Sequence, residues 1–220
     1  SKTMFLDENG NIKNNSNHKG LLATGVPGTV AGLFLAHQKY GKLPWSKLVQ
    51  PAINLAEQGF IFNWNLYRAG QRFKKASDQF PFMSSYFDNK KGELTQPNEI
   101  WKQQALANTL KKIRDNGRDG FYKGDIAEEI ATYMSANGGI ITTEDLEKYE
   151  AIERKPIIGT YKGFDIYGMP PPSSGGIALI EMMNIMELVN WDTIEFNSKE
   201  YVHILTEAMR RAFADRAEFL

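Results

Sequence analysis

Few residue types that perform covalent chemistry occur in this chain of 220 residues, and they are scattered along it. It has no cysteine, which excludes disulfides, thiolate catalysis and cysteine-ligated zinc. The three histidines, His18, His37 and His203, could each serve a serine as a base, but neither G-x-S-x-G nor H-E-x-x-H occurs in the sequence. His18 lies in a polar, Asn-rich segment, and the other two lie beside apolar residues on predicted helices. We interpret all three as surface or core-edge histidines.

Carboxylate pairs are numerous, but they fall on predicted exposed helix faces. Glu128–Glu129, Glu144–Asp145 and Glu147–Glu150 are therefore interpreted as solvated or capping groups. Arg211 and Asp215 are four residues apart and so share one face of a predicted helix. This spacing predicts an ion-pair ladder, and positioning of a neighbouring domain is the alternative.

The segment "PPPSSGG" directly precedes a long apolar run. Successive prolines favour an extended chain. Ser173 and Ser174 could accept hydrogen bonds from free N–H groups at a helix start, and Gly175 and Gly176 permit close backbone approach. The helix predicted at about 175–189 is apolar on nearly all sides, which is typical of a buried helix. Two interpretations stay open: a stiff structural corner, or a pocket wall with an anion site at the helix N-terminus.

No cofactor is expected from the glycine patterns. The segment "GVPGTVAG" has the spacing G-x-x-G-x-x-x-G rather than that of a dinucleotide or Walker loop, and no lysine follows "SSGG". The sequence also lacks the paired-histidine spacing of a metal site.

Composition is that of a soluble globular protein, with 42% hydrophobic and 24% charged residues. The longest apolar candidate, Ile177–Val189, is too short for a membrane helix, and "SKTMFLDENGN" has no signal-peptide character. Residues 1–110 hold 13 basic and 7 acidic side chains, and residues 111–220 hold 13 and 19. The basic residues are scattered, which argues against a nucleic-acid partner. The net charges of the two halves are opposite, which is compatible with two halves that attract each other.

Apolar periodicity predicts a mostly helical α+β chain, with its few strands at about 152–169. A hairpin is predicted from Ile157–Tyr161 and Phe164–Gly168 around the turn Lys162–Gly163. Pro51 should kink or split the helix predicted at about 44–59. Leu21–Thr24 is predicted to be a short strand. Helices are predicted at about 27–41, 44–59, 63–76, 99–117, 124–139 (with Asp125 as N-cap), 142–150 (capped by Thr142 or Thr143), 175–189 and from Ser198 onward. An irregular surface segment is predicted at 77–98, with aromatic anchors Phe80, Phe82, Tyr86 and Phe87.

Several sequence blocks together resemble the γ-glutamyltranspeptidases. They are "GVPGTVAGLFLAHQKYGKLPWSKLVQPAINLAEQGF", "NGGIITTEDLEKYEAIERKPIIGTYKG", "MPPPSSGGIALIEMMNIME" and "YVHILTEAMRRAFADRAEFL", in the family's order. The resemblance implies an N-terminal-nucleophile hydrolase with an αββα sandwich. In that family, a precursor cuts itself into a large and a small subunit. The threonine exposed at the start of the small subunit then attacks the γ-glutamyl amide of glutathione or a related donor, and water, an amino acid or a peptide accepts the acyl group.

The resemblance places this chain in the middle and later part of a large subunit. The family's nucleophile lies in a Thr-Thr-His-Phe-type segment, expected after Leu220, and Thr142 and Thr143 do not match it. The arginine that holds the donor's α-carboxylate is expected before Ser1. The last helix reaches Leu220 without a polar tail, which also suggests that the chain stops inside a larger protein. Of the candidate site residues, only Ser173, Ser174, Gly175 and Gly176 match positions near the family's pocket region.

We therefore expect a single incomplete domain, with a helical part at about 21–150 and a hairpin with buried helices at about 151–220. By itself it should be inactive, should leave strand edges open and should oligomerise or need the small subunit of its own precursor. The resemblance implies no metal or cofactor, and a secreted, periplasmic or cell-surface location. Poly-γ-glutamate depolymerase, cephalosporin acylase and a non-catalytic helical binding module are the alternatives.

Overall fold

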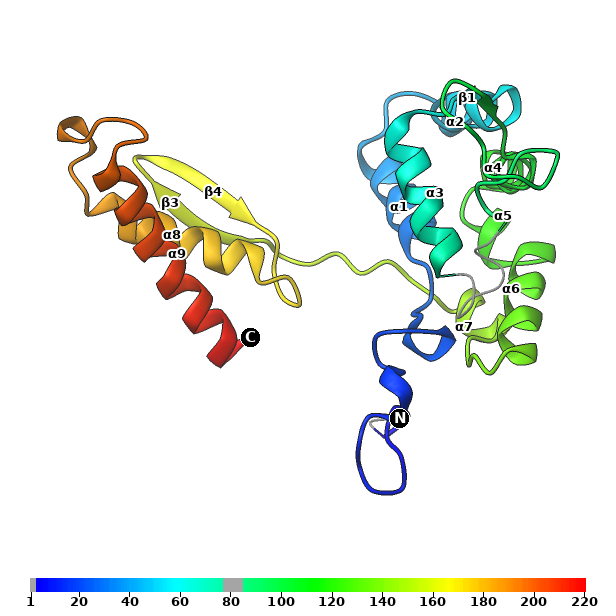
Figure 1. The fold of residues 1–220 in the computed structure, drawn as a ribbon, viewed down its shortest axis with the longest axis horizontal. Helices are drawn as coiled ribbons and strands as arrows, with labels where there is room; N and C mark the ends of the chain where they lie inside the picture. Colours follow the sequence, from blue (N-terminus) through cyan, green and yellow to red (C-terminus); the bar gives the residue numbers. More distant parts are fainter. Residues whose placement is uncertain (1–2, 77–84) are drawn as a thin grey trace. The chain divides into compact units, whose positions relative to one another are not determined.

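A computed structural model describes residues 3–76 and 85–220 (Figure 1). The chain forms two compact units, Ser1–Ala151 and Ile152–Leu220, which we describe separately. The predicted aromatic anchors Phe80 and Phe82 lie outside the described residues. In the described part, no helix is both long and apolar enough to cross a membrane.

The first unit is mainly helical, as the sequence predicts. A two-residue antiparallel pair joins β1 to β2, with Phe60 opposite Trp101. The elements are η1 Lys13–Asn15, η2 Leu21–Ala23, α1 Thr29–Tyr40, α2 Trp45–Gln58, β1 Phe60–Ile61, α3 Trp64–Lys75, β2 Ile100–Trp101, α4 Gln104–Asn116, α5 Asp119–Tyr122, α6 Asp125–Ala136 and α7 Thr143–Glu147.

Two local predictions for this unit are wrong. The strand expected at Leu21–Thr24 is a 3₁₀ turn, because Ala23 and Thr24 donate their N–H groups to Gly20 and Leu21 rather than to another strand. The helix expected from residue 99 begins only at Gln104, because Ile100–Trp101 pairs with β1. Pro51 lies inside α2, so it does not split the helix, and a kink at this position stays a prediction.

Helix starts show where side-chain capping decides the boundary. Thr142 caps α7: its Oγ1 accepts from the Asp145 N–H (3.1 Å), and its own N–H donates to Asp145 Oδ2 (2.9 Å). This reciprocal capping box confirms the predicted cap. Asp125 is not the N-cap of α6; Gly124 takes that position, and the Asp125 carboxylate pairs with Lys112 across to α4 (2.8 Å).

The main core of the first unit is organised around Tyr122, which is fully buried. Its hydroxyl donates to the Pro27 carbonyl (2.5 Å) and accepts from the Ala31 N–H (3.2 Å) at the start of α1. Its ring stacks on Tyr149 at 5.7 Å, and the Arg118 guanidinium lies 4.9 Å from the ring centroid. The buried members of this core are Ala31, Tyr122, Ala127, Met134, Ile141 and Leu146.

A second, aromatic core lies between β1, β2 and α3. Phe62, Phe87 and Trp101 are buried there, and the rings of Phe87 and Trp101 stack at 5.2 Å. Phe87 is therefore confirmed as one of the predicted anchors. Tyr86 touches the same cluster with its ring but leaves 53% of its surface exposed, because it covers the cluster from outside.

The second unit pairs a hairpin with two helices, drawn in yellow to red in Figure 1. The predicted hairpin is confirmed: β3 Ile157–Tyr161 and β4 Phe164–Gly168 are antiparallel, with Ile157 opposite Gly168. Lys162 and Gly163 both have positive φ, as a tight two-residue hairpin turn requires. The other elements are α8 Gly175–Glu187, η4 Trp191–Thr193 and α9 Lys199–Phe219.

Glycines set the distance between this hairpin and α8. A Cβ on Gly168 would stand 2.7 Å from the Cα of Gly176, and a Cβ on Gly176 would collide with the Met169 carbonyl oxygen. A Cβ on Gly159 would stand 2.6 Å from an Ile180 methyl carbon. The hairpin and the helix therefore touch almost backbone to backbone.

The helix α8 is less buried than its composition predicts. Only Gly176 and Ala178 are buried, whereas Leu179 is 41% and Leu188 is 89% exposed. Within this unit α8 packs against the hairpin and α9, and these elements leave part of the helix surface uncovered. The hairpin likewise exposes apolar side chains: Ile158, Phe164 and Tyr167.

Replacing Tyr122 by Phe should destabilise the protein by about 1–3 kcal/mol, because the ring is kept while a buried N–H and a part-buried carbonyl lose their hydrogen-bond partner. Urea denaturation measures this change. The control Tyr40→Phe removes a hydroxyl from a side chain that is 74% exposed and should change stability by less than about 0.5 kcal/mol. Equal stability of the two variants would contradict the role of the Tyr122 hydroxyl.

Gly176→Ala should lower stability by about 1–3 kcal/mol, because the new methyl group meets backbone that cannot rotate away. Gly175→Ala is the matched control in the same helix turn, since its Cβ would meet only Ser173 Oγ at 3.5 Å. Thermal denaturation of both variants provides the comparison. A Gly176→Ala protein as stable as Gly175→Ala would show that the helix can move away from the hairpin at little cost.

Candidate functional site

The proline segment before α8 folds as a turn rather than the extended arm that the sequence predicts. The Ser173 N–H donates to the Pro170 carbonyl (3.2 Å), and the peptide bond between Pro171 and Pro172 is cis. A cis proline at the third position is typical of one class of β-turn. The chain therefore reverses direction just before the helix begins.

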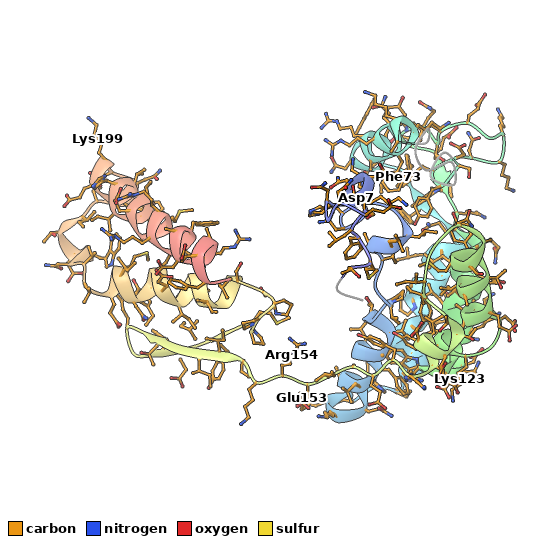
Figure 2. The ribbon with its side chains drawn as sticks, turned by 90° about the horizontal axis from the view of Figure 1, so that it is seen from below. Asp7, Phe73, Lys123, Glu153, Arg154 and Lys199 are labelled. Atoms are coloured by element: carbon orange, nitrogen blue, oxygen red, sulfur yellow. The ribbon has the colours of Figure 1, made fainter. Side chains whose placement is uncertain are left out.

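A cavity of about 390 Å³ lies beside this turn. Ser173 lines it, together with Arg154 from the segment just before β3, which Figure 2 labels. Arg154 Nη1 donates to the Pro171 carbonyl (2.7 Å). The arginine therefore holds the proline turn against the segment before β3. The remaining lining residues are Ile152, Met169, Pro170, Pro171 and Pro172.

Only one of the four candidate wall residues lines this cavity. Ser173 lines it, and its Oγ also accepts a hydrogen bond from the Gly175 N–H (3.3 Å). Ser174, Gly175 and Gly176 are not among the lining residues; Gly176 faces the backbone of Gly168 and Met169 instead. A functional role for the four residues stays a prediction.

Ser174 is held by the last turns of α9. It occupies the N-cap position of α8, but its side chain accepts no hydrogen bond from that helix. Its Oγ instead accepts from Arg216 Nε at 2.7 Å. The Arg216 guanidinium also lies 5.8 Å from the centroid of the Phe213 ring. The predicted capping role is therefore wrong for Ser174, whose backbone is αR rather than the extended conformation typical of a capping residue.

A carboxyl pair also joins the two helices. Burial raises the pKa of Glu181, and the charge and hydrogen bonding of Asp215 raise it further. Arg211 and Asp215 do not form the predicted ion pair in the described structure, because Asp215 faces α8. The ion pair observed on α9 joins Arg210 to Glu207 at 2.7 Å.

The histidines occupy separate surroundings. His37 Nε2 lies 2.7 Å from the Leu43 carbonyl oxygen, and its ring is 5.3 Å from that of Trp45. His203 lies on α9, one helical turn before Glu207. In residues 3–76 and 85–220, no group of three or more metal-ligating side chains comes together.

Two arginines of the site were missed by sequence reasoning. Arg154 and Arg216 contact the proline–serine segment from positions 17 and 42 residues away. Neither lies in a short motif, and one sequence without contact information carries no signal for either pairing.

Comparison with known proteins extends this description. The family model "Gamma-glutamyltranspeptidase" matches residues 1–220. The chain is 43% identical to the glutathione hydrolase proenzyme of Escherichia coli K12 over 229 residues, covering 100% of this chain and 38% of that protein. It is 34% identical to the "Acylase ACY 1 proenzyme" of Pseudomonas sp. SE83, covering 93% of this chain and 37% of that protein.

The fold is shared as well. The crystal structure of Helicobacter pylori γ-glutamyltranspeptidase superposes with a TM-score of 0.92 at 40% identity, covering 100% of this chain and 63% of that one. The chain thus spans little more than a third of the length of the curated relatives it matches. Its α+β fold and its sequence blocks agree with those of the γ-glutamyltranspeptidases, and we conclude that it belongs to the γ-glutamyltranspeptidase family.

Proposed function

We propose that this chain is part of a self-cleaving proenzyme that removes the γ-glutamyl group from glutathione or a related donor. The match of the family model to all of residues 1–220 is the observation that carries the proposal. A threonine outside these 220 residues attacks the γ-amide carbon, while its own terminal amine takes the hydroxyl proton and the leaving amine departs. Water, an amino acid or a peptide then attacks the acyl ester and frees the threonine.

Within this proposal, the chain acts as a scaffold of the large subunit. Its apolar faces support that role: the outward side of the hairpin and part of α8 expose Ile158, Tyr167 and Leu179. Such surface is normally covered by another part of the same protein or by a partner. The partner is the remainder of the precursor, including the small subunit, and the 220-residue chain by itself is inactive.

Expression of the complete protein should yield two polypeptides on a denaturing gel and release p-nitroaniline from γ-glutamyl-p-nitroanilide. The 220-residue chain, purified in the same way, should release none, because the nucleophile lies elsewhere. A complete protein that stays in one piece and releases no chromophore would disprove the proposal. Turnover by the 220-residue chain would disprove the placement of the nucleophile.

Glutathione is the donor that we propose for the complete protein. Similarity to an acylase proenzyme favours an acylase as the second candidate. Within the family this would be a cephalosporin acylase, and poly-γ-glutamate hydrolysis is the third candidate. The self-cleaved protein should hydrolyse glutathione faster than poly-γ-glutamate or a glutaryl-cephalosporin, as measured by released amine. A higher rate on either competitor would reassign the substrate. A non-catalytic binding module would hydrolyse none of them.

Export to the periplasm, cell surface or medium completes the proposal, and it rests on family resemblance. Immunodetection in fractionated cells of the source organism tests it. Exclusive recovery with the cytosol would contradict it.

A further inference from the structure

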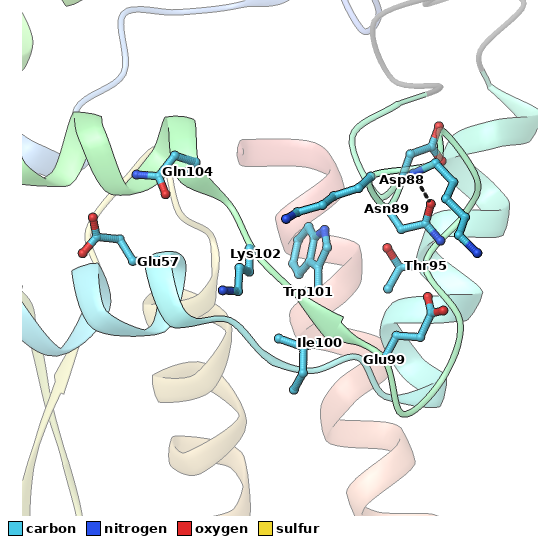
Figure 3. A pocket seen from close by; sticks show the side chains of 11 residues that line it. Glu57, Asp88, Asn89, Thr95, Glu99, Ile100, Trp101, Lys102 and Gln104 are labelled. Atoms are coloured by element: carbon cyan, nitrogen blue, oxygen red, sulfur yellow. Dashed lines mark hydrogen bonds between the residues drawn. The ribbon is translucent and has the colours of Figure 1, made fainter.

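A second and larger cavity lies in the first unit, beside the β1–β2 pair (Figure 3). It has a volume of about 860 Å³. Thr95 and Trp101, which are 1% and 6% exposed, line it, and Ile100 adds an exposed apolar side chain. Lys90, Lys91 and Lys102 also line it, and none of these lysines belongs to a motif identified in the sequence.

The backbone that carries two of these lysines is fixed by a tight turn. Asn89 Oδ1 accepts the N–H groups of Lys91 (2.9 Å) and Glu93 (3.3 Å), and the Asn89 N–H donates to the Glu93 carbonyl (2.7 Å). Gly92 completes the turn with a φ of +75°. An Asn side chain that bonds its own turn in this way restricts the loop. Lys90 and Lys91 therefore project from an ordered support.

The carboxylates around the cavity already have partners. Glu57 forms an ion pair with Lys111, which lowers the pKa of the Glu57 carboxyl. Asp88 pairs with Lys74 at 3.0 Å. Glu99 Oε2 accepts the N–H of Gln96 at 2.8 Å.

The three lysines, in contrast, have no hydrogen-bond or ion-pair partner among the described residues. Two come from the Asn89 turn, and the third comes from the connection between β2 and α4. Their three positive charges line one concave surface, where the Glu99 carboxylate is the one negative charge of the lining without an ion-pair partner among the described residues.

We propose that this cavity binds a small organic or inorganic anion that carries at least two negative groups. An ammonium group is a compact charge with three donors and can meet a carboxylate or a phosphate equally well. A ligand with a single charge would leave part of the lysine cluster unneutralised, whereas a di- or tricarboxylate or a short polyphosphate would reach several lysines together. The exposed face of Ile100 suits the carbon skeleton of a carboxylate ligand. The proposal uses no residue of the second unit and is independent of the enzymatic activity.

Isothermal titration of the complete protein with citrate and, separately, with pyrophosphate tests the site. We expect one binding site per chain, with an affinity that falls when salt is raised to about 0.15 M, where the Debye length is about 8 Å. Binding of citrate only identifies a carboxylate ligand, and binding of pyrophosphate only identifies a phosphoryl ligand. Absence of binding by both anions at millimolar concentration and low salt overturns the proposal.

Two variants distinguish binding at this cavity from non-specific attraction of anions to lysines elsewhere on the protein. The triple substitution Lys90→Gln, Lys91→Gln and Lys102→Gln should weaken binding at least about tenfold, which corresponds to about 1.4 kcal/mol. The control substitutes three exposed lysines elsewhere in the same unit, Lys13, Lys42 and Lys47, by Gln and removes the same net charge. Equal weakening by both triples overturns the proposal.

A measurement on the unaltered protein covers the case in which the triple variant fails to fold. Acetylation rates of individual lysines, read by peptide mass spectrometry, should fall several-fold at Lys90, Lys91 and Lys102 when the bound anion is present. The rates at Lys42 and Lys47 should stay unchanged. Uniform rates at all five lysines would contradict a localised site.

Discussion

The first unit depends on one buried hydroxyl group. Tyr122 bonds both to the carbonyl of Pro27 and to the N–H of Ala31, so it satisfies two backbone groups at the start of α1 from the far side of the core. An unsatisfied buried backbone group costs as much as the hydrogen bond it lacks. The same ring stacks on Tyr149, whose carbonyl is held by Arg118 at 2.6 Å. Helices α1 and α5 and the segment after α7 are therefore joined through a single side chain.

The sequence predicts those features that depend on neighbours along the chain. The capping box at Thr142 and the hairpin turn at Lys162–Gly163 are specified by residues within a few positions, and both are present as predicted. The errors arise where distant partners decide the conformation. Ile100–Trp101 is a strand because β1 pairs with it, and the Ser174 oxygen is taken by Arg216 from 42 residues away.

The difference between local and distant contacts also explains how much of the candidate site can be predicted. The segment "PPPSSGG" is identifiable in the sequence, but its shape depends on contacts that periodicity does not encode. Ser173 borders a cavity, Ser174 faces α9, and Gly176 lies against the hairpin backbone. Adjacent residues of this one short motif thus contact different parts of the second unit. Family membership follows from the order of the sequence blocks rather than from any assembled catalytic group.

The contact between Gly168 and Gly176 has a consequence for how the second unit tolerates sequence change. Because almost no side-chain volume lies between strand and helix at that point, the spacing is set by the main chain itself. Exchanges among the larger apolar residues further along α8, such as Met183, can alter packing at a distance from this contact without changing where the helix begins. The second unit can therefore accumulate hydrophobic substitutions along most of α8 while the turn that precedes the helix keeps its position.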